Sequence, residues 1–452
     1  MSIFDGKRLN PEIFRIDAER MRRGWYSDEY FANTVKVLQT LANEGYTFQG
    51  ESDLPQEIVQ GVKNGDLEVE MQIFARRQPY SLIAGVDEAL AILQSCTGYF
   101  TADGNFVNTA AQLEVEAVQD GTFAFYDGNP RQVEPVIRIR GRYRDFAILE
   151  TPILGTLTET TRVATNVYEV LKAAGGKDVL FFPARFAHYK IQALHGYAYS
   201  LAVQAYNAKY GKKSQVLVST YDQAGWWGGS GNGTMAHATI ACFLGDAATA
   251  MVEFSRILPV SVPRIALVDF HNDCVGDTLR VMKRMFDRYW EHYAAGDFAE
   301  ANKYKLAAVR LDTSSSMRDV SVAPLGKKEL DCGVNPRLVW IVRQAIDQAY
   351  TSWSLPAEAE SVAAEWCKQV KIVATGGFDA KRIREFEELA VPVDTYGVGS
   401  SLLENSRATG TNNDFTADIV RVKIGEDWYP LAKAGRVAND NPNLEKVDLT
   451  KL

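Results

Sequence analysis

Cysteine is scarce in this sequence, and its placement excludes two kinds of site. The 452 residues include five cysteines, at positions 96, 242, 274, 332 and 367. They are odd in number and far apart, and no C-x-x-C or similar spacing occurs among them. A disulfide framework needs evenly paired cysteines, and a structural zinc site needs closely spaced ligands. We therefore expect neither, and a reducing cytoplasm is the compartment that fits.

Long apolar runs and excess positive charge are missing as well. No stretch reaches the roughly 18 apolar residues of a membrane span. The start of the chain lacks the basic-then-apolar order of a signal peptide. With 49 Lys and Arg against 57 Asp and Glu, the formal net charge is −8, which argues against nucleic-acid and anionic-membrane surfaces. A polyanionic ligand would therefore need locally placed arginine, lysine and backbone N–H groups.

The length and composition are those of a globular protein with more than one domain. At 452 residues the chain is too long for one ordinary core, so two or three domains are expected. Hydrophobic residues make up 46% and charged residues 23% of the chain, as in soluble globular proteins. Up to about residue 150, helical periodicity over 31–42 and 82–93 is mixed with strand-like patterns over 67–74 and 136–140.

From about residue 151, strands and helices alternate. Strands are predicted over 179–183, 215–219, 264–269 and 306–312, and helices over 189–208, 235–243, 277–293, 336–353 and 380–390. This alternation predicts a parallel sheet, and the number of repeats favours a closed or nearly closed β/α barrel. The tail has strand character over 415–423 and is expected to pack on the first domain.

Two strands late in the chain end in glycines. One run ends in Thr375-Gly376-Gly377 and the next in Gly397-Val398-Gly399-Ser400. Glycine lets bare backbone N–H groups approach an anion, and the start of a following helix favours negative charge. Consecutive late strands of a parallel barrel that end in this way form the usual phosphate site. The pattern predicts a sugar-phosphate or nucleotide site, and the alternative is two tight turns that need glycine only for their conformation.

Polar residues also follow the earlier strands, where catalytic residues of such barrels sit. They are Arg185, Asp269, Arg310 and Asp312. Arg310 and Asp312 should point the same way, because side chains alternate along a strand. They could form a plain buried ion pair. Alternatively, Arg310 binds a substrate carboxylate or phosphate, while the two aspartates bind ribose hydroxyls or a metal–pyrophosphate.

Two further residues could carry chemistry or only structure. His237 opens an apolar helical segment after the glycine-rich stretch 226–233, with Thr234 as the expected N-cap. It is either a satisfied core group or, with an ordinary pKa near ~6.5, an acid, base or nucleophile. Tyr30 belongs to the aromatic-acidic cluster 25–31, which would pack in a core or stack on a flat heterocycle.

Taken together, these segments resemble the nicotinate phosphoribosyltransferase family over most of the chain. The matching motifs, in the family's order, are Ser27-Asp28-Glu29-Tyr30-Phe31, Gly233-Thr234-Met235-Ala236-His237, Leu267-Val268-Asp269, Val309-Arg310-Leu311-Asp312-Thr313, Thr375-Gly376-Gly377 and Gly397-Val398-Gly399-Ser400. Each motif is modest alone, but six in register are specific.

The resemblance implies a type II phosphoribosyltransferase fold of the α/β class. An α/β N-terminal domain would span 1–150, an irregular β/α barrel would span 151–405, and a C-terminal segment over 406–452 would complete the first domain. The resemblance also implies a homodimer whose active sites are shared between subunits.

The implied reaction joins nicotinate to 5-phosphoribosyl 1-pyrophosphate, with ATP hydrolysis and Mg²⁺, to give nicotinate mononucleotide and pyrophosphate for NAD synthesis. By resemblance, Tyr30 stacks on the pyridine ring, and Thr234 and Arg310 hold the nicotinate. His237 is the residue that ATP phosphorylates, and it is catalytic together with Asp269 and Asp312. The contacts to phosphoribosyl pyrophosphate come from Arg185, Gly376, Gly377, Gly397, Gly399 and Ser400.

The sequence also departs from the family pattern, and rival functions stay open. Only Arg185 stands where the family commonly has paired arginines, and the stretch 208–233 is longer than in compact members. A cysteine-rich C-terminal zinc element of some relatives is absent. The rivals are a nicotinamide phosphoribosyltransferase, a catalytically weak nucleotide-binding sensor and a sugar-phosphate barrel of unrelated chemistry. Quinolinate phosphoribosyltransferase fits less well, because its chains are shorter and use no ATP.

Overall fold

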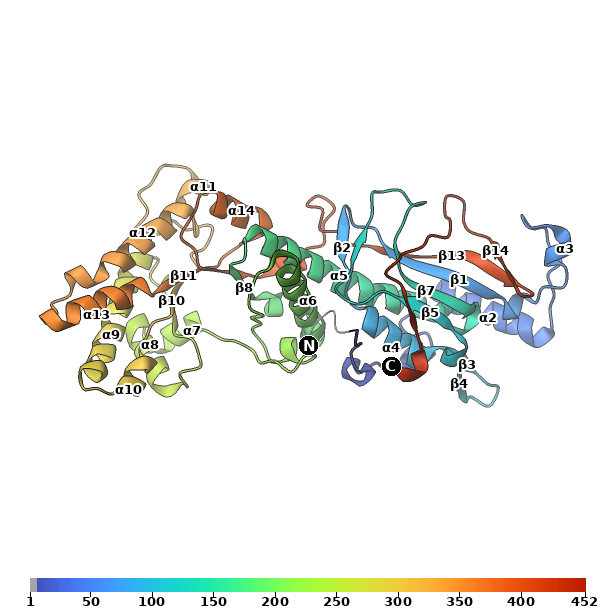
Figure 1. Ribbon diagram of the computed structural model, residues 1–452, viewed down its shortest axis with the longest axis horizontal. Coiled ribbons are helices and arrows are strands. Elements are labelled where there is room, and N and C mark those ends of the chain that lie inside the picture. The colour runs from blue at the N-terminus through green and yellow to red at the C-terminus, as the bar shows by residue number, and fades with distance from the viewer. Residues whose placement is uncertain (1–5) are drawn as a thin grey trace. The chain divides into compact units, whose positions relative to one another are not determined.

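The computed structural model describes residues 6–452 and divides them into two compact units (Figure 1). The first unit contains residues 6–168, 198–205 and 404–452, and the second contains 169–197 and 206–403. Each unit has a sheet of its own. The domain limits expected from the sequence, at residues 150 and 405, remain a proposal.

The first unit is built on a six-stranded antiparallel sheet with the order β14-β13-β1-β7-β5-β15. Its strands are β1 (Glu68–Ala75), β5 (Glu114–Ala117), β7 (Pro135–Arg142), β13 (Phe415–Ile424), β14 (Asp427–Pro430) and β15 (Glu445–Val447). Strand β13, from the tail, pairs with β1 along its whole length, from Glu68 opposite Lys423 to Ala75 opposite Phe415. The C-terminal segment is therefore part of this sheet.

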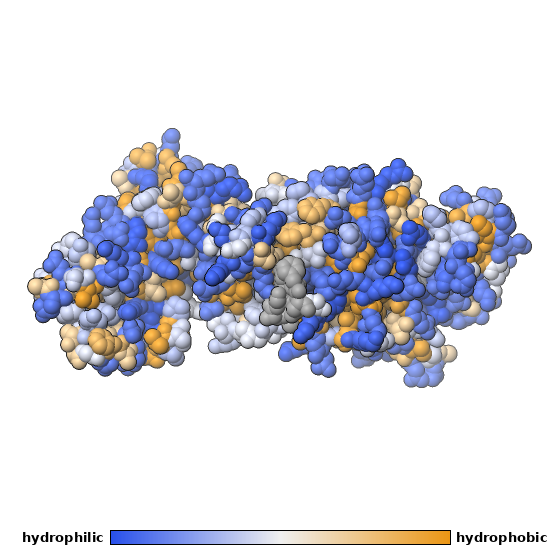
Figure 2. All heavy atoms as spheres, in the orientation of Figure 1, coloured by the Kyte–Doolittle hydropathy of each residue, from blue (hydrophilic) through white to orange (hydrophobic). Residues whose placement is uncertain are grey.

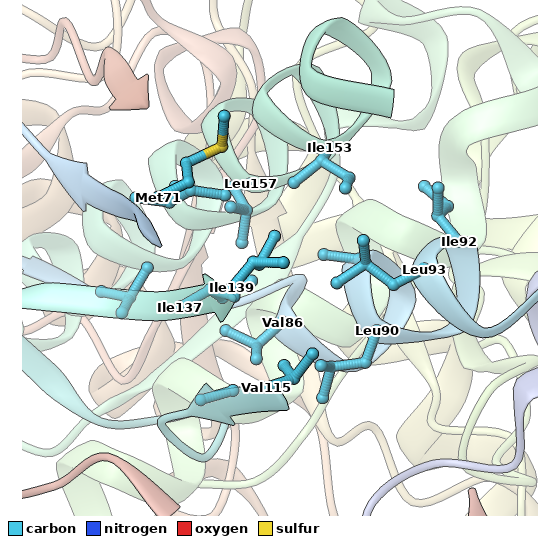
Figure 3. Packing of buried hydrophobic residues seen from close by; sticks show 14 of the residues in the cluster. Met71, Val86, Leu90, Ile92, Leu93, Val115, Ile137, Ile139, Ile153 and Leu157 are labelled. Atoms are coloured by element: carbon cyan, nitrogen blue, oxygen red, sulfur yellow. The ribbon is translucent and has the colours of Figure 1, made fainter. Parts of the chain in front are cut away.

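Two helices cover one face of this sheet and form the core of the unit. They are α4 (Val86–Cys96) and α5 (Glu150–Ala173). Figure 3 shows how their apolar side chains meet those of the strands: Met71, Val115, Ile137 and Ile139 from the sheet, and Leu90, Leu93, Ile153 and Leu157 from the helices. Burial of these side chains is the main stabilising contribution to the unit.

Helix α4 begins later than the predicted range 82–93. Leu82 ends strand β2 (Tyr80–Leu82), and Gly85 just before the helix has a φ of 92°. The Val86 N–H then donates to Asp120 Oδ1 at 2.9 Å. The prediction was wrong at this end because the apolar run continues through a turn that only the positive φ of glycine reveals. The remaining elements of this unit are α1 (Ala18–Arg22), α2 (Glu29–Glu44), α3 (Gln56–Val59), β3 (Gly98–Phe100), β4 (Phe106–Asn108) and β6 (Phe123–Phe125).

The second unit contains a five-stranded parallel sheet with the order β8-β12-β11-β10-β9. The strands are β8 (Asp178–Phe181), β9 (Ile265–Leu267), β10 (Ala308–Leu311), β11 (Lys371–Ala374) and β12 (Thr395–Val398). The helices are α7 (His237–Cys242), α8 (Ala247–Ile257), α9 (Cys274–Ala294), α10 (Phe298–Lys303), α11 (Lys328–Asp331), α12 (Pro336–Gln348), α13 (Ala357–Lys368) and α14 (Ala380–Glu388). Helix α6 (Gln192–Tyr210) is divided, because residues 198–205 belong to the first unit and the rest of the helix to the second. The predicted α/β class with a parallel sheet is confirmed.

The predicted strand over 215–219 forms only in part. Val218 makes a single parallel bridge with Phe181, at the edge of β8. Beyond it, the backbone N–H groups of Ser219 and Thr220 donate to the Gln223 side chain, at 2.9 and 3.1 Å. The chain therefore turns before a ladder can grow. Within residues 6–452, no strand pairing joins this segment to β9 at the other edge, so closure of the barrel stays a prediction.

None of the helices in residues 6–452 combines the length and the apolar run that crossing a membrane requires. On the face drawn in Figure 2, hydrophobic and hydrophilic residues are interspersed over both units.

The packing of the parallel sheet predicts the effect of filling one glycine. A Cβ added at Gly397 would lie 2.5 Å from Thr375 Cγ2 and 2.9 Å from the Phe182 ring. We expect Gly397→Ala to lower the free energy of unfolding by about 1–3 kcal/mol, because such overpacking forces neighbours apart. The control is Gly155→Ala in α5, where a Cβ meets nothing within 4 Å and should stabilise by about 0.5–1 kcal/mol. Urea denaturation measures both; equal stability of the two variants would contradict the prediction.

Candidate functional site

The side chain of Arg310, on β10, is the centre of a polar network at the carboxyl ends of the parallel strands. Its Nη2 donates to Asp312 Oδ2 at 2.9 Å, and its Nη1 donates to the Thr234 hydroxyl at 3.1 Å. The guanidinium carbon lies 5.7 Å from the centre of the Phe182 ring. The side chain is 16% exposed, and the buried Nε–H has no hydrogen-bond partner among the described residues. Of the three guanidinium nitrogens of this nearly buried cation, Nε is thus the one left without any partner.

Asp312 connects Arg310 to the first glycine turn. Its Oδ1 accepts a hydrogen bond from the Thr375 hydroxyl at 2.7 Å, and it would lie 3.4 Å from a Cβ added at Gly376. Arg310 and Asp312 do project to the same side of the sheet, as the alternation of side chains predicts. Thr375 was not singled out by the sequence analysis, although a polar residue directly after a buried strand is a usable signal.

His237 lies against the end of β9. Its Nε2 is 3.0 and 3.1 Å from the two carboxylate oxygens of Asp269. The imidazole is 45% exposed, whereas the Asp269 side chain is only 8% exposed. The hydrogen bond to Asp269 raises the pKa of His237 above its ordinary value, against the opposing effect of burial. Asp312 raises this pKa further and Arg310 lowers it, so the histidine lies within electrostatic reach of the Arg310 network.

Thr234 does not cap the helix that follows it. Helix α7 begins at His237, its N-cap is Ala236, and no side chain caps it. The Thr234 hydroxyl instead accepts the hydrogen bond from Arg310. The predicted N-cap was wrong because a contact with a distant strand competes with the local one.

The two glycine turns lie side by side but differ in what they require of glycine. Gly376 and Gly377 have φ values of 89° and 73°, a conformation that side-chain-bearing residues rarely adopt. Gly399 has no positive φ; a Cβ there would lie 2.8 Å from the Phe186 ring. The Ser401 hydroxyl donates to the Phe378 carbonyl at 2.8 Å, which links the second turn to the first. A side chain at Gly399 would therefore first displace Phe186, and the expected contact of Gly399 with phosphate stays a prediction.

The remaining predicted residues are Arg185 and Ser400 in the second unit and Tyr30 in the first. Arg185 is exposed, and its guanidinium carbon lies 5.2 Å from the centre of the Phe186 ring. Ser400 is exposed and opens a short 3₁₀ helix, Ser400–Leu403. Tyr30 belongs to the first unit, where its ring is 61% exposed and its hydroxyl donates to Asp28 Oδ2 at 3.1 Å.

The donor set suits a cation that arrives with a phosphate better than a resident metal. Among residues 6–452, no three His, Cys, Asp or Glu side chains gather closely enough to hold a metal ion. Asp269 and Asp312 are each already engaged, by His237 and by Arg310. Mg²⁺ is commonly bound through one or two carboxylates together with substrate phosphates, and these two residues fit that use.

Comparisons with known proteins show similarity to phosphoribosyltransferases. Residues 53–161 match the N-terminal domain family of quinolinate phosphoribosyl transferase. The crystal structure of nicotinate-nucleotide pyrophosphorylase from Pyrococcus furiosus is similar with a TM-score of 0.62 and 25% identity, over 96% of this chain and 85% of that one. Together with curated relatives named nicotinate phosphoribosyltransferases, these matches support the type II phosphoribosyltransferase family.

Two curated relatives and a further solved structure are also similar. The nicotinate phosphoribosyltransferase pncB2 of Mycobacterium tuberculosis is 26% identical over 64% of this chain, and the match spans about half, 48%, of that relative. Its paralogue pncB1 is 22% identical, over 80% of this chain and 68% of the relative. Human nicotinic acid phosphoribosyltransferase has a TM-score of 0.53 at 15% identity, over 88% of this chain and 74% of that one, which supports the fold alone.

The pairing of His237 with Asp269 predicts how the histidine titrates. We expect Asp269→Asn to lower the pKa of His237, because the hydrogen bond to the carboxylate is the largest cause that raises it. The free energy of unfolding should be larger for wild type than for Asp269→Asn at pH values below the pKa of His237 in the unfolded chain. This difference should vanish as the pH rises through the pKa of His237 in the folded protein. Imidazole NMR titration measures the first effect and thermal melts across pH 5–9 the second; an unchanged pKa in a folded variant would refute the pairing. This pH range brackets the ordinary pKa of histidine, near ~6.5.

Proposed function

We propose that this protein is a nicotinate phosphoribosyltransferase. It would join nicotinate to 5-phosphoribosyl 1-pyrophosphate with ATP hydrolysis and release nicotinate mononucleotide and pyrophosphate. The observation that carries the proposal is Arg310, a nearly buried guanidinium at a strand end with an unpartnered Nε–H. A planar carboxylate is the ligand that a free edge of guanidinium suits best. We further propose a cytoplasmic homodimer with shared sites, in which Tyr30 stacks on the pyridine ring.

The arrangement around Arg310 supports a preference for nicotinate over nicotinamide. Asp312 and Thr234 engage two of its nitrogens and fix the plane of the guanidinium. Nicotinate would offer its carboxylate to the Nε–H of Arg310. The neutral amide of nicotinamide would bring no negative charge to pair with the guanidinium. A site built to hydrogen-bond one group discriminates strongly against an analogue that lacks it.

Quinolinate is a second candidate acceptor, because residues 53–161 match the quinolinate phosphoribosyl transferase N-terminal domain. This acceptor carries two adjacent carboxylates and would need a second cationic group beside Arg310. Among the described contacts, Arg310 is paired with one carboxylate, that of Asp312. The His237–Asp269 pair, within electrostatic reach of Arg310, adds a second carboxylate. The balance of charge therefore favours the acceptor with a single carboxylate.

In the proposed transfer, the nicotinate ring nitrogen forms a bond to C1 of the sugar. The bond from C1 to the pyrophosphate oxygen breaks, and its electron pair leaves with pyrophosphate. We assign the ribose hydroxyls to Asp269 and Asp312, and the 5-phosphate to the turns at Gly376, Gly377 and Gly399. Mg²⁺, when bound with the diphosphate, would offset its negative charge. The protein's own contribution is chiefly to position the ring nitrogen and the sugar.

The proposed role of ATP depends on which nitrogen of His237 is free. Because Nε2 faces Asp269, its proton is held there and the lone pair resides on Nδ1. Nδ1 would attack the γ-phosphorus of ATP, and the bond to the β–γ bridging oxygen would break and release ADP. The phosphate adds about two negative charges beside the substrates. Since protonation of Nδ1 blocks the attack, the raised pKa of His237 predicts that this step slows as the pH falls below it.

Arg310→Ala should lose turnover with nicotinate far more than it disturbs folding. Loss of charge-assisted hydrogen bonds of about 1.5–3 kcal/mol each corresponds to roughly 10–150-fold per bond in kcat/KM. The measurement is mononucleotide formation from nicotinate, nicotinamide and quinolinate by wild type and variant, with melting temperature as the control for folding. Equal efficiency of the wild-type protein with nicotinamide would remove the assignment of Arg310.

His237→Ala should keep a slow, ATP-independent transfer and lose the coupled hydrolysis of ATP. With γ-labelled ATP, the wild-type protein should carry an acid-labile, base-stable label on the peptide that contains His237. The matched control is His271→Ala, because His271 Nδ1 pairs with Asp277 at 3.1 Å and its side chain is 48% exposed, much like His237. The label should survive in that control. Full ATP stimulation in His237→Ala would make this histidine structural.

A further inference from the structure

Arg382 lies beneath the first glycine turn and binds its carbonyl oxygens. The residue is in the first turn of α14, where its backbone N–H donates to the N-cap Asp379 at 2.7 Å. Its side chain turns back, and Nη1 donates to the carbonyls of Gly376 and Gly377 at 2.8 and 3.1 Å. The guanidinium carbon lies 4.3 Å from the centre of the buried Phe378 ring.

These contacts fix where the N–H groups of the turn point. In a trans peptide the C=O and the N–H project in opposite directions. The carbonyls of Gly376 and Gly377 face Arg382, so the N–H groups of Gly377 and Phe378 project from the other side of the turn. Neither N–H donates to any acceptor among the described residues. Two free donors side by side form a concave site suited to an anion.

The same guanidinium joins the turn to the loop that follows β10. Nη2 of Arg382 donates to the Val334 carbonyl at 2.7 Å. Next to it, Gly333 has a φ of 69°, and a Cβ there would lie 3.2 Å from Ser315 Cα and 3.8 Å from Arg382 Nη2. One side chain therefore holds the loops after two neighbouring strands in a fixed relation.

The charge of Arg382 is offset only at a distance, by Asp379 and Glu385, which raise the pKa of Arg382 against the effect of burial. The guanidinium makes three hydrogen bonds to carbonyls and no salt bridge with any described residue. Burial lowers the pKa of Arg382, but an arginine remains charged in a protein. The nearby Phe378 and Phe386 rings, at 4.3 and 5.8 Å, keep water from part of it. A positive charge thus lies directly behind the two free N–H groups.

We propose that Arg382 is a positioning residue for the phosphate monoester of the substrate: it orients the N–H groups of Gly377 and Phe378 and supplies behind them a positive charge that no direct salt bridge neutralises. The proposal rests on the proposed function, in which this turn receives the 5-phosphate. Arg382 itself does not touch the substrate.

The test is binding of ribose 5-phosphate to the full chain by calorimetry, in wild type, Arg382→Ala and Arg382→Lys. We expect at least tenfold weaker binding in Arg382→Ala, partial recovery in Arg382→Lys, and unchanged binding of nicotinate. In turnover, KM for 5-phosphoribosyl 1-pyrophosphate should rise more than kcat falls. The salt dependence of ribose 5-phosphate binding should be shallower in Arg382→Ala than in wild type.

The matched control is Arg343→Ala. Arg343 binds a carbonyl at the amino end of β11, whereas Arg382 binds carbonyls of the turn after the carboxyl end of β11. Arg343 binds the Val370 carbonyl at 2.7 Å, just before β11, and is paired with Asp347. Its loss should leave ribose 5-phosphate binding unchanged. Wild-type affinity in a folded Arg382→Ala overturns the proposal, as does an equal loss in Arg343→Ala. If Arg382→Ala does not fold, wild-type affinity in Arg382→Lys overturns it.

The two proposals fail separately. If the wild-type protein binds ribose 5-phosphate in an Arg382-dependent way but makes no mononucleotide from nicotinate, the proposed function is wrong and the role of Arg382 stands. If it makes the mononucleotide while Arg382→Ala retains full affinity and KM, only the role of Arg382 is wrong.

Discussion

The register of β10 against its neighbours is the constraint on which the candidate site depends. Arg310 is opposite Leu267 on β9, and Leu311 is opposite Ala374 on β11. This alignment ends the three strands at one level, so that residues one or two positions beyond each end come together. A shift of one residue would turn Arg310 and Asp312 together to the other face of the sheet. It would break the contact of Arg310 with Thr234 and that of Asp312 with Thr375. Hydrogen bonds between backbones thus determine which side chains can act together.

Charge within the site is arranged in pairs that leave selected donors free. Asp312 is shared between Arg310 and Thr375, and Asp269 is engaged by His237. A buried carboxylate or guanidinium without a partner is costly, so each group is partly satisfied within the protein. What remains is small and directional: the Nε–H of Arg310, on the one guanidinium nitrogen without a partner, and one ring nitrogen of His237. These are the features that a ligand could complete, and they arise only because the other polar atoms are occupied.

Much of the second unit could be predicted from the sequence, because its elements are local and repetitive. Strands and helices alternate with clear periods, and the polar residues that matter follow strands at short distance in the chain. The failures share one cause, which is competition from distant contacts. Thr234 resembles an N-cap but is engaged by Arg310; the segment 215–219 resembles a strand, but its backbone is captured by the Gln223 side chain. Arg382 gave no signal, because an arginine in a charged, amphipathic helix normally indicates a solvated face.

The glycines at the two strand ends show that one sequence pattern can have two physical causes. At Gly376 and Gly377 the backbone itself requires glycine, since both φ values are positive. Gly397 and Gly399 have ordinary backbone angles, and the requirement is space: the Thr375, Phe182 and Phe186 side chains occupy the volume of a Cβ. Only the first pair turns its carbonyls toward a cation and leaves N–H groups free on the other side. The second turn abuts it through Ser401. If a phosphate binds here, the directional hydrogen bonds should therefore come mainly from the first turn, while the second sets the shape of the wall beside it.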